Sequence, residues 1–352
     1  MTKAVALYSG GLDSTLAILA MQKQGIEVTA ITFLNHFGCD VSDRSSCSKD
    51  PFAASVKFGF KVKLSHLSDN FMKIVKNPKY GHGKNMNPCV DCRILMLKEA
   101  KEFMQLTGAD FIVTGEVLGQ RPMSQRKDCF PLVDREAEVK GLVLRPLSAK
   151  HLKKTIPEES GLVDREKLYG FTGRSRKAQI ALAEEFGLTE YPAPAGGCLL
   201  TDPIYSFRLK DLLAFNNDPD YKDINFLRVG RHFRISPDCK IIVGRNKAEN
   251  DLIVSLCGPD DHILRVIGHG SPMTTLRGHV TDHAISIAAS LCARYSDGKN
   301  LPELNVLMTK SDKKAYLKTI PADEEIIEEY RIAEKEKTCE CPDGLTIEVR
   351  PR

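Results

Sequence analysis

A glycine-rich turn near the start of the chain has the composition of a phosphate-binding loop. Residues 4–8 form an apolar run, Ser9-Gly10-Gly11-Leu12-Asp13-Ser14 follows, and apolar residues then recur at helical spacing. In a strand, turn and helix of this kind, backbone amides and the helix N-terminus face an anion, and serine hydroxyls add donors. An aspartate beside phosphates is explained if it holds Mg²⁺. The turn therefore predicts a pyrophosphate site.

A tight turn capped by Asp13 would explain the same residues without a ligand. A Walker A loop is excluded, because it ends in Gly-Lys followed by Ser or Thr. The order of strand, Ser-Gly-Gly-x-Asp-Ser turn and helix resembles the PP-loop ATP pyrophosphatases. This resemblance implies attack of a substrate oxygen on the α-phosphate of ATP, release of pyrophosphate and formation of an adenylate. It also implies the following nucleotide contacts: Ser9, Gly10, Gly11, Asp13 and Ser14, with Ile31, Thr32 and Phe33 beside the adenine.

A second polar segment follows the apolar run of residues 111–113. It reads Thr114-Gly115-Glu116-Val117-Leu118-Gly119-Gln120, and Met123-Ser124-Gln125 comes shortly after it. Open α/β sheets bind ligands at the carboxyl ends of their strands, so this position favours function over a plain polar loop. The segment resembles a motif of the tRNA 4-thiouridine synthetase family, although Arg121 adds a charge to that motif. The resemblance implies that Gly115, Glu116 and Gln120 contact the nucleotide.

Three cysteines occur in contexts suited to chemistry. Cys89 and Cys92 form a Cys-x-x-Cys at a predicted helix start, where the N-terminal amides and Arg93 would stabilise thiolates. Cys198 follows two glycines, which allow close approach of a substrate or cluster. A thioredoxin-like pair would leave Cys198 unexplained, and a structural zinc site normally needs four ligands. Candidates for a fourth zinc ligand, Cys129 or His82, lack the spacing.

The cysteine pattern together with the PP-loop looks like the iron-sulfur-dependent tRNA thiolation enzymes. By this resemblance, Cys89, Cys92 and Cys198 would hold a 4Fe-4S cluster with one open iron, whereas ordinary clusters use four cysteines. Persulfide chemistry at Cys198 with Cys89 or Cys92 is the competing interpretation, and structural zinc or inert thiols is the third. The remaining cysteines have simpler interpretations: Cys257 and Cys292 as core, and Cys39, Cys47, Cys339 and Cys341 without an assigned role.

Alternating strand and helix patterns predict the fold of the first part of the chain. They favour an α/β class with a parallel, doubly wound sheet, of the adenine nucleotide alpha hydrolase type that the PP-loop resemblance implies. A smaller α+β domain is expected to follow, with strands that include residues 252–256 and a helix over 284–294. The expected divisions are a PP-loop domain over 1–217, a smaller domain over 218–322 and a charged tail over 323–352.

The smaller domain contains a basic segment. Residues 240–251 and the Gly-His-Gly-Ser-Pro turn at 268–272 resemble the RNA-binding NFACT-R module. Net charge is only +4, so a nucleic-acid partner rests on local clusters and not on the whole chain. A solvated charged face is the alternative. The residues predicted to bind RNA phosphates are Arg228, Arg231, Arg234, Lys240, Arg245 and Lys247.

Together these features predict a tRNA thiouridine synthase that uses ATP, Mg²⁺ and a 4Fe-4S cluster. Asp13, Cys89, Cys92 and Cys198 would be its catalytic residues, and Asp13 would hold the magnesium. Its partners would be tRNA and a sulfur donor, either inorganic sulfide or a persulfide-carrying protein. An amidating ligase and a non-catalytic RNA-binding protein are the alternatives. No apolar run is long enough to span a bilayer and no signal peptide is evident, so a cytoplasmic location is expected.

Overall fold

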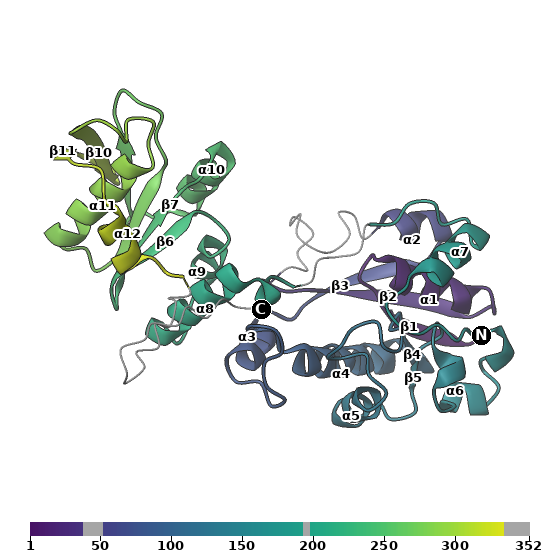
Figure 1. The fold of residues 1–352 in the computed structure, drawn as a ribbon. Helices are drawn as coiled ribbons and strands as arrows, with labels where there is room; N and C mark the ends of the chain where they lie inside the picture. Colours follow the sequence, from purple (N-terminus) through teal and green to yellow (C-terminus); the bar gives the residue numbers. More distant parts are fainter. Residues whose placement is uncertain (38–51, 193–197, 334–352) are drawn as a thin grey trace, which may run out of the picture. The chain divides into compact units, whose positions relative to one another are not determined.

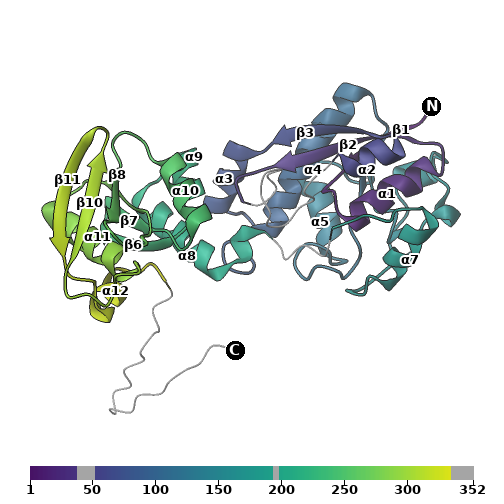
Figure 2. The same cartoon turned by 90° about the horizontal axis from the view of Figure 1, so that it is seen from above.

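The computed structural model describes residues 1–37, 52–192 and 198–333. These residues form two compact units, Met1–Asp202 and Pro203–Arg352, which Figures 1 and 2 colour from purple to teal and from teal-green to yellow. Each unit has its own sheet, parallel in the first and antiparallel in the second. The predicted α/β class with a second, smaller α+β domain is confirmed.

The first unit is a five-stranded parallel sheet in the order β3-β2-β1-β4-β5. Its strands are β1 (Lys3–Leu7), β2 (Glu27–Leu34), β3 (Lys61–His66), β4 (Phe111–Thr114) and β5 (Val143–Leu144). Its α-helices are α1 (Leu12–Gln22), α2 (Ala53–Phe58), α3 (Ser68–Lys76), α4 (Cys89–Thr107), α5 (Cys129–Glu136), α6 (Ile156–Glu159) and α7 (Lys177–Glu185). Helices α1, α2 and α7 lie on one side of the sheet and α4 and α5 on the other (Figure 1).

The strand order of this sheet determines where a ligand can bind. From β1 the chain continues to β2 on one side, whereas β4 pairs with the opposite edge of β1. The order of the strands therefore switches direction between β1 and β4. A parallel sheet opens a crevice at such a switch point, beyond the carboxyl ends of the strands. Both strands are apolar and almost fully buried, as central parallel strands require. The loops after β1 and β4 therefore meet in the crevice.

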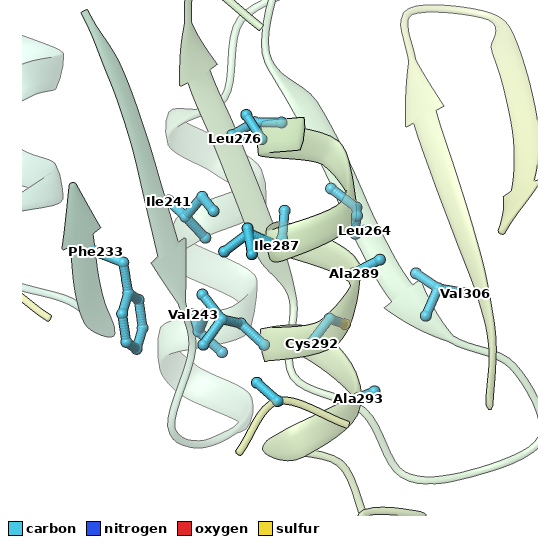
Figure 3. Packing of buried hydrophobic residues seen from close by; sticks show 14 of the residues in the cluster. Phe233, Ile241, Val243, Leu264, Leu276, Ile287, Ala289, Cys292, Ala293 and Val306 are labelled. Carbon is cyan, nitrogen blue, oxygen red and sulfur yellow. The ribbon is translucent and has the colours of Figure 1, made fainter. Parts of the chain in front are cut away.

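The second unit is a six-stranded sheet in the order β11-β10-β8-β9-β7-β6, and its neighbouring strands pair antiparallel. Its strands are β6 (Arg231–Ser236), β7 (Cys239–Val243), β8 (His262–Val266), β9 (Thr274–Gly278), β10 (Leu304–Lys310) and β11 (Lys313–Thr319). Its helices are α8 (Pro203–Phe215), α9 (Tyr221–Phe226), α10 (Lys247–Leu256), α11 (Asp282–Arg294) and α12 (Glu324–Tyr330). Figure 3 shows α11 packed on one face of this sheet, with Ile287 and Cys292 among strand residues such as Val243 and Leu264.

The division between the units lies earlier than the expected boundary after residue 217. Helix α8 falls within the second unit. Its buried Arg208 donates hydrogen bonds to the carbonyls of Leu227 and Gly230, at 2.8 and 2.7 Å. The proline and aspartates at 218–220 therefore form a turn inside the unit, where Asp220 caps α9.

Two further expectations for the second unit differ from the structure. Residues 252–256 were predicted to be a strand but belong to α10, because Asn246 caps this helix by accepting a hydrogen bond from the Glu249 amide. The expected tail from residue 323 begins with an integral helix, since Asp323 caps α12 and Ile327 is buried in the core. Within the described ranges, no helix has both the length and the apolar character needed to cross a bilayer.

Candidate active site at the sheet switch point

The turn after β1 presents uncapped backbone amides. Gly10 has a φ of 70°, in the left-handed region that L side chains rarely adopt. Gly11 precedes α1 without a side-chain cap, so the first amides of this helix face outward. The Ser9 and Ser14 hydroxyls lie 3.2 Å apart, and Ser14 donates to the Gly11 carbonyl at 2.9 Å. This is the local geometry expected of an anion cradle.

Gly115, at the end of β4, lies directly against this turn. A Cβ at Gly115 would stand 2.5 Å from the Ser14 nitrogen and 2.6 Å from the Asp13 carbonyl carbon. Both of these atoms belong to the backbone and cannot move aside easily. Glycine at 115 therefore allows the loops after β1 and β4 to pack together, and this position supports the turn from behind.

The two carboxylate oxygens of Asp13 differ in their hydrogen bonding. Its Oδ2 accepts a hydrogen bond from Gln120 Nε2 at 3.0 Å, whereas its Oδ1 is buried without a partner among the described residues. Burial raises the pKa of this carboxyl, and Gln120 and the cations of Arg176 and Arg121 partly oppose that shift. A hard carboxylate oxygen with no protein partner fits a magnesium ligand. The structure thus places Asp13 and Gln120, two residues predicted to bind the nucleotide, within hydrogen-bond distance of each other.

Two residues at the start of α7 had no predicted functional role. Arg176 precedes this helix and Gln179 lies in its first turn, and both act on the Asp13 carboxylate. Both amide atoms of Gln179 and the Nε of Arg176 are buried without hydrogen-bond partners among the described residues. The basic run Arg174-Ser175-Arg176-Lys177 after a glycine was the available signal. These groups bring further buried donors and positive charge close to the Asp13 carboxylate.

Glu116 has a different surrounding from the one predicted. It is only 3% exposed and lies between two guanidiniums, with Arg145 Nε at 2.9 Å and Arg93 Nε at 3.1 Å. Burial alone would raise the pKa of this carboxyl, but Arg93 and Arg145 hold it below its usual value. Arg145 also forms a bidentate pair with Asp134, at 2.7 and 2.9 Å. Glu116 therefore links α4, β4 and α5 through buried ion pairs, and its predicted nucleotide contact stays a prediction.

The three predicted cysteines lie in one electrostatic neighbourhood. Cys89 and Cys92 occupy the first turn of α4, and Cys198 precedes a short 3₁₀ turn. Burial raises the pKa of the Cys92 thiol, and the charges of Cys198 and Cys89 add to this shift. The charge of Arg121 acts on both Cys89 and Asp13, where it opposes the effect of burial on their pKa values.

The two thiols of α4 are held in the protonated form, contrary to the expectation of stabilised thiolates. Burial raises the pKa of Cys89, against the opposing charges of Arg121 and Arg93. Burial also raises the pKa of Cys92 to about 12, with Arg93 opposing it. The guanidinium of Arg93 is shared with Glu116, and its attraction does not outweigh the loss of water around the sulfur.

The described residues do not present these thiols as a finished metal site. No group of three or more His, Cys, Asp or Glu side chains within the described ranges is arranged to hold a metal ion. The Cys198 thiol instead donates to the Phe37 carbonyl at 3.2 Å. The predicted cluster ligands are thus brought near one another but not into a ligand geometry. Cys39, Cys47, Cys339 and Cys341 lie outside the described residues.

The residues predicted to contact adenine lie beside the phosphate turn. Ile31, Thr32 and Phe33 are at the end of β2, and the Tyr8 amide donates to the Ile31 carbonyl at 2.9 Å. All three are buried, and the Thr32 hydroxyl has no partner among the described residues. An apolar strand end with one open hydroxyl is compatible with a purine ring.

The six residues predicted to bind RNA differ in their contacts, and several of them are already paired within the chain. Arg234 forms a bidentate pair with Asp211, and Arg245 pairs with Glu249. Arg231 stacks on Tyr295, with the guanidinium carbon 4.3 Å from the ring centroid. Burial lowers the pKa of Lys240 to about 7. Arg228 is half-buried, and Lys247 is exposed and forms no ion pair within the described part of the chain. They do not form an open basic stripe.

Comparison with known families matches each unit separately. Residues 1–158 match the family described as thiamine biosynthesis protein (ThiI). The first unit is therefore similar to the ThiI family over residues 1–158. Residues 230–331 match the NFACT protein RNA binding domain. Both resemblances expected from the sequence are confirmed, and the ThiI-type region includes the phosphate turn, Gly115, Gln120 and the Cys89–Cys92 pair.

Curated proteins similar to this chain carry names connected with tRNA thiolation. The bifunctional protein NifU/MnmA of Rubrobacter xylanophilus is 31% identical over 45% of this chain and 36% of its own length. The tRNA-specific 2-thiouridylase MnmA of Pelotomaculum thermopropionicum is 25% identical over 66% of this chain and 64% of its own. A probable tRNA sulfurtransferase of a Thermoanaerobacter strain is 33% identical over 34% of this chain and 30% of its own. The chain thus spans less than two thirds of each of these relatives.

Proposed function

We propose that the chain is an ATP-dependent tRNA sulfurtransferase that converts a uridine to a thiouridine. The observation that carries this proposal is the open Asp13 Oδ1 at the switch point, linked through Arg121 to the thiol region around Cys89. Adenylation and sulfur chemistry thereby share one crevice. The ThiI-type match and the NFACT match support the nucleotide and the RNA partner respectively.

The first step is adenylation of the base. The uridine carbonyl oxygen attacks the α-phosphate of ATP, and pyrophosphate leaves toward the uncapped amides between Ser9 and Ser14. Mg²⁺ would be held by Asp13 and would neutralise charge on the phosphates. Gln120 orients the Asp13 carboxylate through its 3.0 Å hydrogen bond. Arg176 and Arg121, which already act on Asp13, add positive charge where phosphate charge develops.

The second step is sulfur transfer. In the persulfide route, a persulfide-carrying protein transfers its terminal sulfur to the Cys198 thiolate and leaves as a thiol. Inorganic sulfide would serve as the donor only in the cluster route. The terminal sulfur of the persulfide attacks the activated carbon and AMP leaves. A thiol of Cys89 or Cys92 then attacks the Cys198 Sγ, releasing the thiouridine and forming a disulfide, which a thiol reductant restores. Because burial holds both α4 thiols protonated, the attacking thiol must lose its proton during the step.

A 4Fe-4S cluster on Cys89, Cys92 and Cys198 is the finer proposal for sulfur delivery. The shared neighbourhood of the thiols supports it, and the described side-chain arrangement, which lacks a three-ligand group, does not. Anaerobic purification followed by iron and sulfide analysis separates the two routes. An iron-free protein that still thiolates tRNA removes the cluster, whereas activity that tracks iron content removes the persulfide route.

The proposal is tested by incubating the full chain with ATP, Mg²⁺, unmodified tRNA and, in separate reactions, either sulfide or a persulfide donor with a thiol reductant. Nucleosides are then analysed by mass spectrometry. We expect a thionucleoside that requires ATP and disappears in Cys198→Ser, while that variant still releases pyrophosphate. Cys257→Ser in the second unit is the matched control, because its thiol donates only to Thr275. Release of pyrophosphate with an amidated product would instead identify an amidating ligase, and no modified product at all would reject the assignment.

A further inference from the structure

The two faces of the second sheet are occupied very differently at its β8, β10 and β11 edge. Alternation along these strands directs Leu264, Val266 and Val306 into the core beneath α11 (Figure 3). Their neighbours must point to the opposite face. Pairing aligns Leu307 with both Arg265 and Tyr316, so these three form one row across the three strands.

This opposite face carries an exposed aromatic ring between cations. Tyr316 is 74% exposed, and Lys314 and Lys318 lie two residues to either side of it on the same strand face. Arg265 is exposed in the same row. Beneath the ring, Leu307 is buried. An exposed tyrosine on an apolar base leaves a ring surface open to a stacking partner.

The cations on this face are available, in contrast to the basic residues near β6 and β7. Within the described part of the chain, no ion pair involves Arg265 or Lys314. Lys318 pairs with Glu303 at 3.4 Å, with side chains 72% and 54% exposed. An exposed ion pair of this kind contributes little to stability, so a phosphate can replace Glu303 as the partner of Lys318. Free cations beside an open ring suit a partner that offers both phosphates and flat bases.

We propose that this surface, formed by Arg265, Lys314, Tyr316 and Lys318 and called here the Tyr316 face, binds single-stranded RNA. An unpaired base stacks on the Tyr316 ring, and phosphates on either side of it contact Lys314, Lys318 and Arg265. Stacking on an exposed ring requires a base out of a duplex, so loops and ends are bound in preference to paired stems. The inference rests on the proposed RNA substrate of the chain.

Fluorescence anisotropy with a labelled unmodified tRNA and a labelled single-stranded oligoribonucleotide, without ATP, tests the Tyr316 face. Tyr316→Ala should weaken binding of both probes roughly tenfold, because the stacking ring is lost. Tyr316→Phe keeps the ring and should bind as the wild type does. The high exposure of Tyr316 means that neither substitution disturbs the core.

Two matched double variants test whether RNA binding depends on this face or only on the total positive charge. Lys314→Ala with Lys318→Ala removes two lysines from the Tyr316 face, and Lys310→Ala with Lys313→Ala removes two exposed lysines whose alternation places them on the other face. The first pair should reduce the slope of log affinity against log salt by about 1 to 2. The second pair should leave it nearly unchanged.

Three results would overturn the inference: unchanged binding by Tyr316→Ala, equal losses in the two lysine pairs, or equal competition by duplex RNA and single strands. The outcome is distinguishable from that of the proposed function. Thiolation without any dependence on Tyr316 rejects only the Tyr316 face. Binding that depends on Tyr316 in a chain that makes no thionucleoside rejects only the proposed sulfurtransferase.

Discussion

The two units differ in how their polar groups are used. In the first unit, Asp13, Gln179 and Arg176 keep buried polar atoms without partners in the described structure, grouped around one crevice. In the second unit, single buried polar atoms of His232, His262 and Thr274 also lack partners in the described structure, but they are spread over separate strands. The arginines that stand out in its sequence, such as Arg234 and Arg245, are bound to acidic neighbours. Because a buried polar group without a partner is costly, such atoms point to a ligand, whereas paired cations point to structure. Residue type alone does not separate the two cases.

The largest expected effect tests whether Glu116 is structural. Glu116→Gln should destabilise the first unit by about 3 to 5 kcal/mol, because Arg93 and Arg145 lose their shared buried counter-charge. Urea unfolding of the full chain measures this effect. A variant with wild-type stability but weakened ATP binding would instead make Glu116 a nucleotide ligand.

The packing of the two loops at the switch point is tested by Gly115→Ala. The added methyl meets backbone atoms at 2.5 to 2.6 Å, so the phosphate turn must shift. We expect ATP affinity measured by calorimetry to fall roughly 10- to 100-fold, since losing one hydrogen bond to a charged phosphate costs about 1.5 to 3 kcal/mol. Gly258→Ala, where the nearest atom is 3.8 Å away, is the control and should bind ATP normally. Normal binding by both variants would contradict the close packing.

The lowered pKa of Lys240 predicts that the stability of the second unit depends on pH. Burial lowers the pKa of Lys240 in the folded chain to about 7, against a usual 10.5. The unfolded chain therefore binds more protons between these values, and stability should rise with pH across that interval, by on the order of 2 kcal/mol between about pH 7 and 9. Lys240→Met should flatten this rise while leaving the Arg234–Asp211 pair in place. Thermal unfolding at several pH values measures it, and an unchanged slope in the variant would contradict the assignment.

The smallest effect is expected for a cation that the sequence suggested for RNA. Arg245 is bound to Glu249 within one helical turn, so Arg245→Ala should change tRNA affinity by about twofold or less, as expected for a rim contact already satisfied within the chain. Anisotropy at two salt concentrations checks this. A loss as large as that of Tyr316→Ala would restore the predicted basic cluster as the RNA surface.

Much of the fold and of the phosphate site could be predicted because the signals are local. A buried strand, a glycine pair and a helix specify the Ser9–Ser14 turn, and the strand order then requires the Gly115 loop to meet it. The roles of Glu116 and Arg234 could not be predicted, since their partners Arg145 and Asp211 are distant in sequence. Residues 252–256 were assigned wrongly because a short apolar run does not distinguish strand from helix.

The protonated thiols were missed for a related physical reason. The position of Cys92 at a helix start is visible in the sequence, but its burial depends on the packing of the whole unit. Burial outweighs both the helix terminus and Arg93. Gln179 was missed because a glutamine on a helix usually faces solvent, and only the packed structure buries it beside Asp13.

The central claim is that Asp13 drives ATP cleavage in the crevice, and RNA-dependent release of pyrophosphate by Asp13→Asn tests it most directly. Asp110→Asn is the matched control, because Asp110 accepts a hydrogen bond from the Lys3 amide at the amino-terminal edge of the sheet. The account predicts that Asp13→Asn folds normally but releases pyrophosphate at background rates, while Asp110→Asn keeps wild-type rates. Release at the wild-type rate by Asp13→Asn would contradict it.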